Sequence, residues 1–204
     1  ALSKGRILDD SLPLLAQAGI VPLEDPRTSR RLVFDTSLAH VQLVLIRATD
    51  VPTYVRYGAA DLGFSGKDVL MEQSDLDLYE LFDLGIARCR LVVAEPQAAA
   101  NGTRGLRPRV ATKYPNITRQ FFADRGLQAE IVKLYGSMEL APLVGLADQI
   151  VDLVSTGKTL AANGLVEVEQ IAPVSTWLVA NKAAMKLKHA ALTAITQRLQ
   201  EVVA

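Results

Sequence analysis

The stretch that decides the fold is Ile150-Val151-Asp152-Leu153-Val154-Ser155-Thr156-Gly157-Lys158-Thr159-Leu160. An apolar run of strand length, Ile150 to Val154, passes through a short hydroxyl-rich turn into a predicted helix at residues 160–163. The same order of strand, polar turn and helix occurs upstream, at residues 109–125 and 131–146. Alternating strands and helices predict an α/β fold with mostly parallel sheets flanked by helices.

The composition is that of a globular protein with a full apolar core. Half of the 204 residues are apolar, and 22 basic residues balance 22 acidic ones. A balanced charge gives no general attraction to nucleic acid or to a membrane surface, so an anion site must be local. No run reaches the length of a membrane span, and the start of the sequence lacks the apolar centre of a signal peptide. We therefore expect a cytoplasmic protein.

Cysteine and histidine are too few for several kinds of chemistry. Cys89 is the single cysteine, which excludes a disulfide framework and a cysteine-rich zinc site. His40 and His189 are the two histidines, and they lie far apart in the sequence. We therefore expect catalysis without a histidine base.

The turn from Ser155 to Thr159 has the composition of a phosphate-binding loop. Unpaired backbone amides at a helix start attract anions, Gly157 permits close approach, and three neighbouring hydroxyls can donate hydrogen bonds. These hydroxyls belong to Ser155, Thr156 and Thr159. A phosphomonoester is the expected ligand, and a capped turn without any ligand is the alternative.

The ending Gly157-Lys158-Thr159 also resembles a Walker A loop, but that motif requires a glycine at the position of Asp152. A nucleoside-triphosphatase site is therefore disfavoured. A carboxylate three residues before the loop suits another task, because it can accept hydrogen bonds from ribose hydroxyls while the loop holds the 5′-phosphate. The pattern indicates recognition of a phosphoribosyl group.

Other charged or glycine-containing turns are candidates for the same site. Ser3-Lys4-Gly5-Arg6 and Ser29-Arg30-Arg31 place cations beside predicted elements, where a polyanion could bind or where the charges could simply face solvent. Asp61 to Asp68 and Tyr135 to Glu139 are further junctions of strand, glycine turn and helix. Such turns at the carboxyl ends of strands make a binding crevice the expected arrangement.

The chain resembles a known family, the short-form catalytic subunit of ATP phosphoribosyltransferase. The resembling motifs run almost from end to end of the chain. They are residues 1–6 (Ala1 to Arg6), 50–55 (Asp50 to Val55), 58–63 (Gly58 to Gly63), 66–70 (Gly66 to Leu70), 111–116 (Ala111 to Asn116), 134–142 (Leu134 to Pro142) and 152–160 (Asp152 to Leu160).

The resemblance implies a two-lobed fold like that of type II periplasmic binding proteins, with a ligand cleft between the lobes. Residues 1–88 plus 175–204 would form lobe I, and residues 89–174 would form lobe II with the phosphoribosyl-phosphate loop. The chain stops after the helix that precedes the regulatory domain of the family's long form, so it resembles the short form.

The resemblance also implies a reaction. The enzyme would transfer the phosphoribosyl group of phosphoribosyl pyrophosphate (PRPP) to N1 of ATP and release pyrophosphate, which is the first step of histidine biosynthesis. The implied binding site for PRPP consists of Glu139, Asp152, Ser155, Thr156, Gly157, Lys158 and Thr159, with the two carboxylates on the ribose hydroxyls.

The implied catalytic cations are Arg6, Lys4 and Arg30, which would stabilise the departing pyrophosphate. We expect Arg30 to act in its own site or in that of a neighbouring subunit. The implied ATP-binding residues are Arg6, Gly66, Lys67, Tyr114, Asn116 and Ser137.

The family further implies a cofactor and partners. Mg²⁺ would be carried by the substrate phosphates, with no protein metal ligand. A regulatory subunit resembling histidyl-tRNA synthetase would complete a hetero-octamer, and the catalytic subunits would also associate with each other. No nucleic acid or membrane partner is expected.

Two other functions remain open from the sequence. A two-lobed small-ligand binding or sensor domain without catalysis would share the fold, but it has no need of Lys4, Arg6 and Arg30. A nucleotide hydrolase would use Lys158, although Asp152 breaks its motif.

Overall fold

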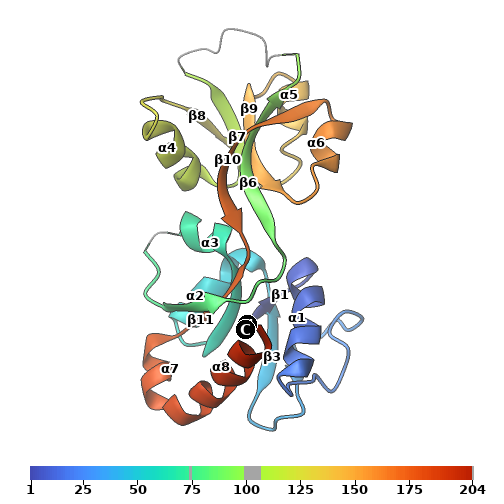
Figure 1. Cartoon of the computed structure of the whole chain (residues 1–204), viewed down its shortest axis with the longest axis vertical. Helices are drawn as coiled ribbons and strands as arrows, with labels where there is room; N and C mark the ends of the chain where they lie inside the picture. The colour runs from blue at the N-terminus through green and yellow to red at the C-terminus, as the bar shows by residue number, and fades with distance from the viewer. Residues whose placement is uncertain (74, 99–106, 204) are drawn as a thin grey trace. The chain divides into compact units, whose positions relative to one another are not determined.

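The computed structural model describes residues 1–73, 75–98 and 107–203, and the chain divides into two units (Figure 1). Unit 1 comprises Ala1–Ala87 and Ser175–Ala204, and unit 2 comprises Arg88–Val174. The chain thus enters unit 2 once and leaves it once, at residues 87/88 and 174/175. The predicted lobe boundaries are 88/89 and 174/175.

The first sheet of unit 1 has the strand order β1-β3-β2. Its strands are β1 (Leu2–Ser3), β2 (Val33–Asp35) and β3 (Gln42–Ile46). β1 runs parallel to β3, whereas β2 and β3 form an antiparallel pair in which Phe34 lies opposite Leu43. The nearly continuous apolar run of β3 therefore lies in the middle of this sheet, as expected of a strand covered on both faces.

The second sheet of unit 1 has the order β4-β11-β5. Its strands are β4 (Leu62–Gly66), β5 (Tyr79–Asp83) and β11 (Thr176–Ala180), and both outer strands are antiparallel to β11. Leu178, Val179 and Ala180 of the central strand are fully buried. The segment that returns to unit 1 thus forms the middle of its second sheet.

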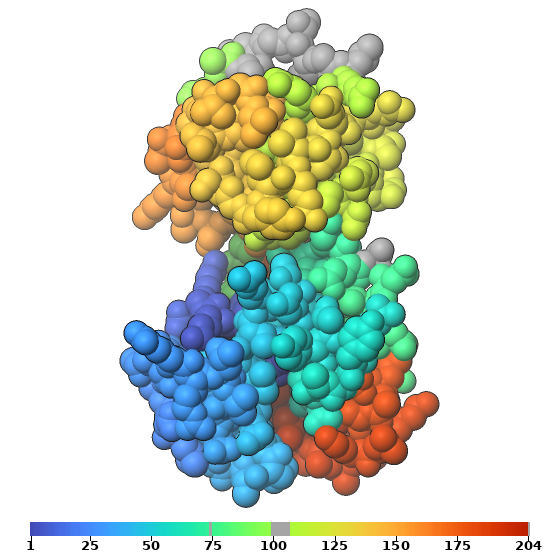
Figure 2. All heavy atoms as spheres, turned by 180° about the vertical axis from the view of Figure 1, so that it is seen from behind, coloured from blue at the N-terminus to red at the C-terminus, as the bar shows by residue number. Residues whose placement is uncertain are grey.

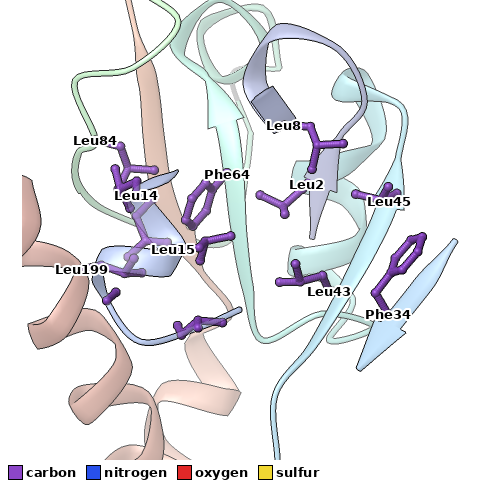
Figure 3. Packing of buried hydrophobic residues seen from close by; sticks show 13 residues of the cluster. Leu2, Leu8, Leu14, Leu15, Phe34, Leu43, Leu45, Phe64, Leu84 and Leu199 are labelled. Atoms are coloured by element: carbon purple, nitrogen blue, oxygen red, sulfur yellow. The ribbon is translucent and has the colours of Figure 1, made fainter. Parts of the chain in front are cut away.

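The helices of unit 1 close its core. They are α1 (Arg6–Gln17), α2 (Val51–Arg56, preceded by the 3-10 turn η1 at Ala48–Asp50), α3 (Lys67–Glu72), α7 (Lys182–Leu187) and α8 (His189–Val203). Figure 3 shows Leu2, Leu8, Phe64 and Leu199 among the labelled side chains of the core. These four residues come from β1, α1, β4 and α8 and are at most 5% exposed, so the core joins both ends of the chain.

Unit 2 contains one five-stranded sheet in the order β10-β6-β9-β7-β8. The strands are β6 (Cys89–Pro96), β7 (Arg109–Thr112), β8 (Glu130–Lys133), β9 (Gln149–Val154) and β10 (Leu165–Val174). β7 is parallel to both β8 and β9, and β6 is antiparallel to both β9 and β10.

Helices cover this sheet on both sides. α5 (Leu140–Leu143) and α6 (Lys158–Ala162) pack on one face, where Ala141 and Leu160 join Val92 and Ile150 in a core cluster. α4 (Pro115–Ala123) lies on the other side, as Figure 1 shows. A sheet covered on both faces requires apolar residues at successive positions, and Leu91 to Ala94 are all buried.

The predicted α/β class is confirmed, but the sheets are mixed rather than mostly parallel. In unit 2, β6 alone is reversed, because the chain enters at the edge where β10 leaves and β6 must run away from that edge. In unit 1, β11 starts one residue after the chain returns and is reversed for the same reason. β2 is reversed because it is the first arm of a hairpin.

Within the described ranges, no helix is long and apolar enough to cross a membrane.

Exposed apolar side chains gather on segment 135–146 of unit 2, which is drawn yellow on the face shown in Figure 2. They are Tyr135, Leu140, Leu143, Val144 and Leu146, with exposed fractions from 44% to 86%.

Candidate active site

Three turns of unit 2 lie at the same edge of its sheet. β7, β8 and β9 are mutually parallel, so the turns that follow Thr112, Lys133 and Val154 all leave the sheet at its carboxyl edge. Every predicted PRPP-binding residue lies at that edge, in these turns, at the start of α6 or near the end of β9. The carboxyl edge of parallel strands is where open α/β sheets hold their ligands.

The third of these turns is the predicted phosphate loop, Ser155 to Thr159. Gly157 adopts a left-handed conformation with φ of 76°, which an L side chain rarely adopts, and it forms the N-cap of α6. Lys158 and Thr159 begin the helix with exposed side chains. Among the described residues, no acceptor takes the amides of Thr156 and Gly157.

The loop differs from a long-helix anion site in one respect. α6 has only five residues, so the aligned peptide dipoles behind the loop are few. The capacity to bind an anion therefore depends on the loop amides, on the hydroxyls of Ser155, Thr156 and Thr159, and on the Lys158 ammonium. Lys158 has no ion-pair partner within the part of the chain that the structure describes.

Asp152 lies inside β9 rather than in the loop. It pairs with Val92 of β6 across the sheet and is half-buried, and one of its carboxylate oxygens accepts the Leu153 amide at 2.8 Å. Asp152 shares its sheet face with Val154, because side chains two residues apart in a strand point the same way. The structure therefore places this carboxylate just before the loop.

The turn after β8 carries Ser137 and Glu139. Ser137 has a φ of 52°, a left-handed conformation that is uncommon for a residue with a side chain. Met138 is buried in the core cluster of unit 2 and so anchors the turn, while Ser137 is exposed. Half-buried Glu139 is the N-cap residue of α5. Strained non-glycine residues of this kind are frequent at ligand sites.

The turn after β7 is held by two buried threonines. Thr112 donates its hydroxyl to the Val151 carbonyl at 2.8 Å and accepts the Tyr114 amide at 2.9 Å. Thr118 donates to the Tyr114 carbonyl at 2.7 Å. Tyr114 is only 3% exposed, with the Lys113 ammonium 4.9 Å from its ring centre. The exposed Lys113 and Asn116, rather than the Tyr114 ring, thus face solvent at this turn.

The predicted cations of unit 1 lie around the start of its first helix and on a surface segment. Gly5 has φ of 84° and ψ of −147°, a glycine-only conformation that lets the chain turn from β1 into α1 between Lys4 and Arg6. Both side chains are exposed, and the Arg6 Nε lies 3.9 Å from an Asp10 oxygen. Arg30 is exposed and has no ion-pair partner among the described residues, whereas Arg31 pairs with Glu24.

Gly66 and Lys67 join β4 to α3 in unit 1. The Lys67 ammonium binds Glu80 at 2.5 Å and lies 4.6 Å from the centre of the Trp177 ring. Gly66 is buried, and a Cβ there would lie 2.2 Å from a carboxylate oxygen of Asp68. The predicted ATP contacts at this turn are thus engaged by side chains of the chain itself.

Sequence reasoning missed two residues beside the phosphate loop. Arg90 donates to the Ser155 carbonyl at 3.0 Å and forms an ion pair with Glu167, and this pair raises the pKa of the Arg90 guanidinium. The two residues are 77 positions apart in the sequence, and no local pattern marks them. Sequence reasoning also did not name Lys113 as a site residue, although its position directly after β7 was an available signal.

The described residues contain no group of three His, Cys, Asp or Glu side chains that could hold a metal ion.

Known proteins resemble this chain over nearly its whole length. The family model described as "HisG: ATP phosphoribosyltransferase" matches residues 47–201. An ATP phosphoribosyltransferase of Methylococcus capsulatus is 61% identical over 203 residues, which cover the whole chain and 94% of that relative. The chain belongs to the ATP phosphoribosyltransferase family. Residues 152–160 of the phosphate loop and its strand lie inside the matched region.

Solved structures of two kinds resemble this family member. The ATP phosphoribosyl transferase (HisG:HisZ) complex from Thermotoga maritima contains a chain that matches with a TM-score of 0.84 and 32% identity, covering 99% of this chain and 97% of that one. The periplasmic aliphatic sulphonate binding protein SsuA from Escherichia coli matches with a TM-score of 0.52 and 12% identity, covering 79% and 62%. The second match concerns the fold alone and confirms the predicted likeness to periplasmic binding proteins.

Proposed function

We propose that this chain catalyses attack of N1 of ATP on C1 of PRPP. The new N1–C1 bond forms as the bond from C1 to pyrophosphate breaks, and the products are N1-phosphoribosyl-ATP and pyrophosphate. The observation that carries the proposal is membership of the ATP phosphoribosyltransferase family over nearly the whole chain. This reaction opens histidine biosynthesis and makes the chain a transferase of pentosyl groups.

The loop from Ser155 to Thr159 is proposed to bind the 5′-phosphate of PRPP. Its support is the left-handed Gly157, the two amides without an acceptor among the described residues, and the exposed Lys158. Asp152 and Glu139 are proposed to accept hydrogen bonds from the ribose hydroxyls, because both are half-buried carboxylates at the same sheet edge. The loop would fix the sugar and take no part in bond breaking.

Leaving-group stabilisation is proposed to come from Arg6, Lys4 and Arg30. Negative charge builds on the departing pyrophosphate, and preorganised cations lower the barrier most when they meet the charge that develops. All three side chains are exposed in unit 1, and Arg6 would exchange its ion pair with Asp10 for the polyanion. Magnesium ions that accompany the substrate phosphates would neutralise further charge.

The ATP contacts are proposed at Arg6, Gly66, Lys67, Tyr114, Asn116 and Ser137. Several of these residues already make contacts within the chain or would act indirectly. Lys67 must exchange Glu80 for a ligand, and Tyr114 would act through its turn because its ring is buried. The Asn116 Oδ1 already accepts a hydrogen bond from Arg119 Nη1 at 3.2 Å, which an ATP contact would have to replace or share. Ser137 is exposed.

We propose that the chain works in the cytoplasm with a separate regulatory subunit. The support is the structural match to the Thermotoga maritima HisG:HisZ complex, which covers nearly all of both chains. Self-association of the catalytic chain is proposed as well. The alternative of a sensor domain without catalysis is not favoured, because the likeness to solute-binding proteins is confined to the fold.

One assay tests the reaction. The protein is mixed with ATP, PRPP and magnesium, and pyrophosphate is measured together with the absorbance of an N1-substituted adenine nucleotide. The proposal expects both products in equal amounts and none when PRPP is omitted. Release of orthophosphate alone would support a hydrolase, and binding of both substrates without turnover would support a sensor; either result contradicts the proposal.

A further inference from the structure

A partly exposed ion pair contacts the phosphate loop. Arg90, the second residue of β6, donates its Nε to Glu167 Oε2 at 2.9 Å and its Nη2 to Glu167 Oε1. The remaining Nη1 donates to the Ser155 carbonyl at 3.0 Å. One planar guanidinium thus connects β10 to the first residue of the loop, and each side chain of the pair is only 31% exposed.

This contact orients a peptide group of the loop. The C=O and N–H of one trans peptide unit point in opposite directions. Because the Ser155 carbonyl points toward Arg90, the Thr156 amide of the same peptide points away from Arg90. That amide is one of the two without an acceptor among the described residues, and it is thereby kept available for a ligand.

Glu167 also lies against the glycine of the loop. Its Oε1 is 3.5 Å from the position that a Cβ would occupy on Gly157. An uncompensated carboxylate this close would repel a bound phosphate. The bidentate bond to Arg90 neutralises this charge and at the same time holds both side chains in one geometry.

We infer that Arg90 and Glu167 are positioning residues that hold the Ser155 to Thr159 loop in its phosphate-binding shape. The inference rests on the proposed function, since it takes the 5′-phosphate of PRPP as the ligand of the loop. Neither residue touches the reacting atoms in this scheme. The pair acts on the affinity for PRPP by fixing the backbone.

A second ion pair of the chain serves as a matched control, because it joins two elements without contacting the loop. Glu169 lies two residues after Glu167 on β10 and binds Arg125 in a pair of similar exposure, 39% and 45%. Arg125 donates its Nη1 to the Phe121 carbonyl of α4 at 3.0 Å and makes no hydrogen bond or ion pair with the loop in the described part of the chain. Removing this pair should affect stability without affecting the loop.

The experiment compares Arg90→Met with Arg125→Met in the full chain. The readouts are KM for PRPP, KM for ATP, kcat, and the thermal midpoint. Loss of a hydrogen bond to a charged group corresponds to roughly a 10- to 150-fold change in affinity. We expect Arg90→Met to raise KM for PRPP at least about tenfold, with KM for ATP and kcat within about twofold. Arg125→Met should leave all three kinetic values unchanged.

Arg90→Lys separates geometry from charge. Lysine keeps the charge but cannot bind Glu167 and the Ser155 carbonyl in one planar fork, so KM for PRPP should stay raised about fivefold or more. If Arg90→Met does not fold, Glu167→Gln carries the test, because its amide oxygen can accept from the guanidinium while the second bond is lost. We expect a rise in KM for PRPP of about threefold in that variant.

Three results would overturn the inference. These are an unchanged KM for PRPP in folded Arg90→Met, full restoration by Arg90→Lys, and an equal shift in Arg125→Met. Failure of the proposed function looks different, because the wild-type chain would then give no transferase products at all. In that case PRPP binding measured by calorimetry with the same variants still decides whether the pair positions the loop.

Discussion

Two junctions of this chain share the order strand, glycine, lysine and helix, but their surroundings differ. At the end of β9, Gly157 is left-handed and Lys158 is exposed without an ion-pair partner among the described residues. At the end of β4, Gly66 is buried against Asp68, and Lys67 binds Glu80 and Trp177. The first junction is open to a ligand, and the second is filled by the chain's own side chains. A glycine and lysine in sequence therefore do not show by themselves which kind of junction is present.

The largest effect on stability is expected at Gly66. A Cβ at this position would lie 2.2 Å from an Asp68 oxygen in a buried setting, so Asp68 or the backbone must shift. Overpacking of this kind costs about 1–3 kcal/mol. Gly66→Ala should lower the free energy of unfolding by that amount, measured by urea denaturation.

Gly136→Ala is the control for Gly66→Ala. Nothing lies within 4 Å of a Cβ at Gly136, so its free energy of unfolding should change by less than about 0.5 kcal/mol. Equal destabilisation by the two substitutions would show that the crowding at Gly66 has no consequence.

A smaller effect distinguishes the two lysines. Lys67→Met removes a partly exposed ion pair and a cation–π contact, so it should lower the free energy of unfolding by about 1 kcal/mol. Lys158→Met should leave stability within about 0.5 kcal/mol of wild type. Its Kd for PRPP, measured by calorimetry, should instead rise several-fold. The comparison between the junctions fails if Lys158→Met destabilises the chain and leaves PRPP binding unchanged.

The smallest effect is expected at the opposite edge of the unit 2 sheet. Arg109 at the start of β7 binds Asp148 just before β9, and this hydrogen bond holds the pKa of the Asp148 carboxyl below its usual value. A depressed folded-state pKa stabilises the protein above the unfolded pKa, and the stabilisation is lost as pH falls through the folded pKa. The pair is about half exposed, so its contribution is below about 1 kcal/mol.

Asp148→Asn should therefore lower stability slightly at pH 7 and match wild type in strong acid, as followed by urea denaturation at a series of pH values. Its KM for PRPP should equal that of wild type, because the pair lies away from the loop edge. A stability difference that grows as pH falls would contradict the assignment.

Much of this structure is predictable because its signals are local. The apolar runs of β3 and β9 and the glycine turn after β9 indicate strands and a helix from neighbouring residues alone. The family motifs then indicate the activity. The residues of the phosphate loop are adjacent in sequence, so they could be named without a structure.

The remaining features depend on contacts between distant residues. The reversal of β6 follows from where the chain enters unit 2, which no local pattern records. The pairing of Arg90 with Glu167 and that of Lys67 with Glu80 depend on the folded arrangement. The burial of the Tyr114 ring is a further case, because the motif around it shows only that the turn matters.

The decisive quantity for the phosphate loop is the Kd of PRPP for Thr159→Val, measured by calorimetry beside the Kd of ATP. Valine keeps the shape of threonine and removes one exposed hydroxyl donor at the first turn of α6. A hydrogen bond to a charged phosphate corresponds to roughly a 10- to 150-fold change in affinity. We predict a Kd for PRPP raised at least about tenfold, with an unchanged Kd for ATP and an unchanged thermal midpoint. A Kd for PRPP within twofold of wild type would contradict the assignment of the loop.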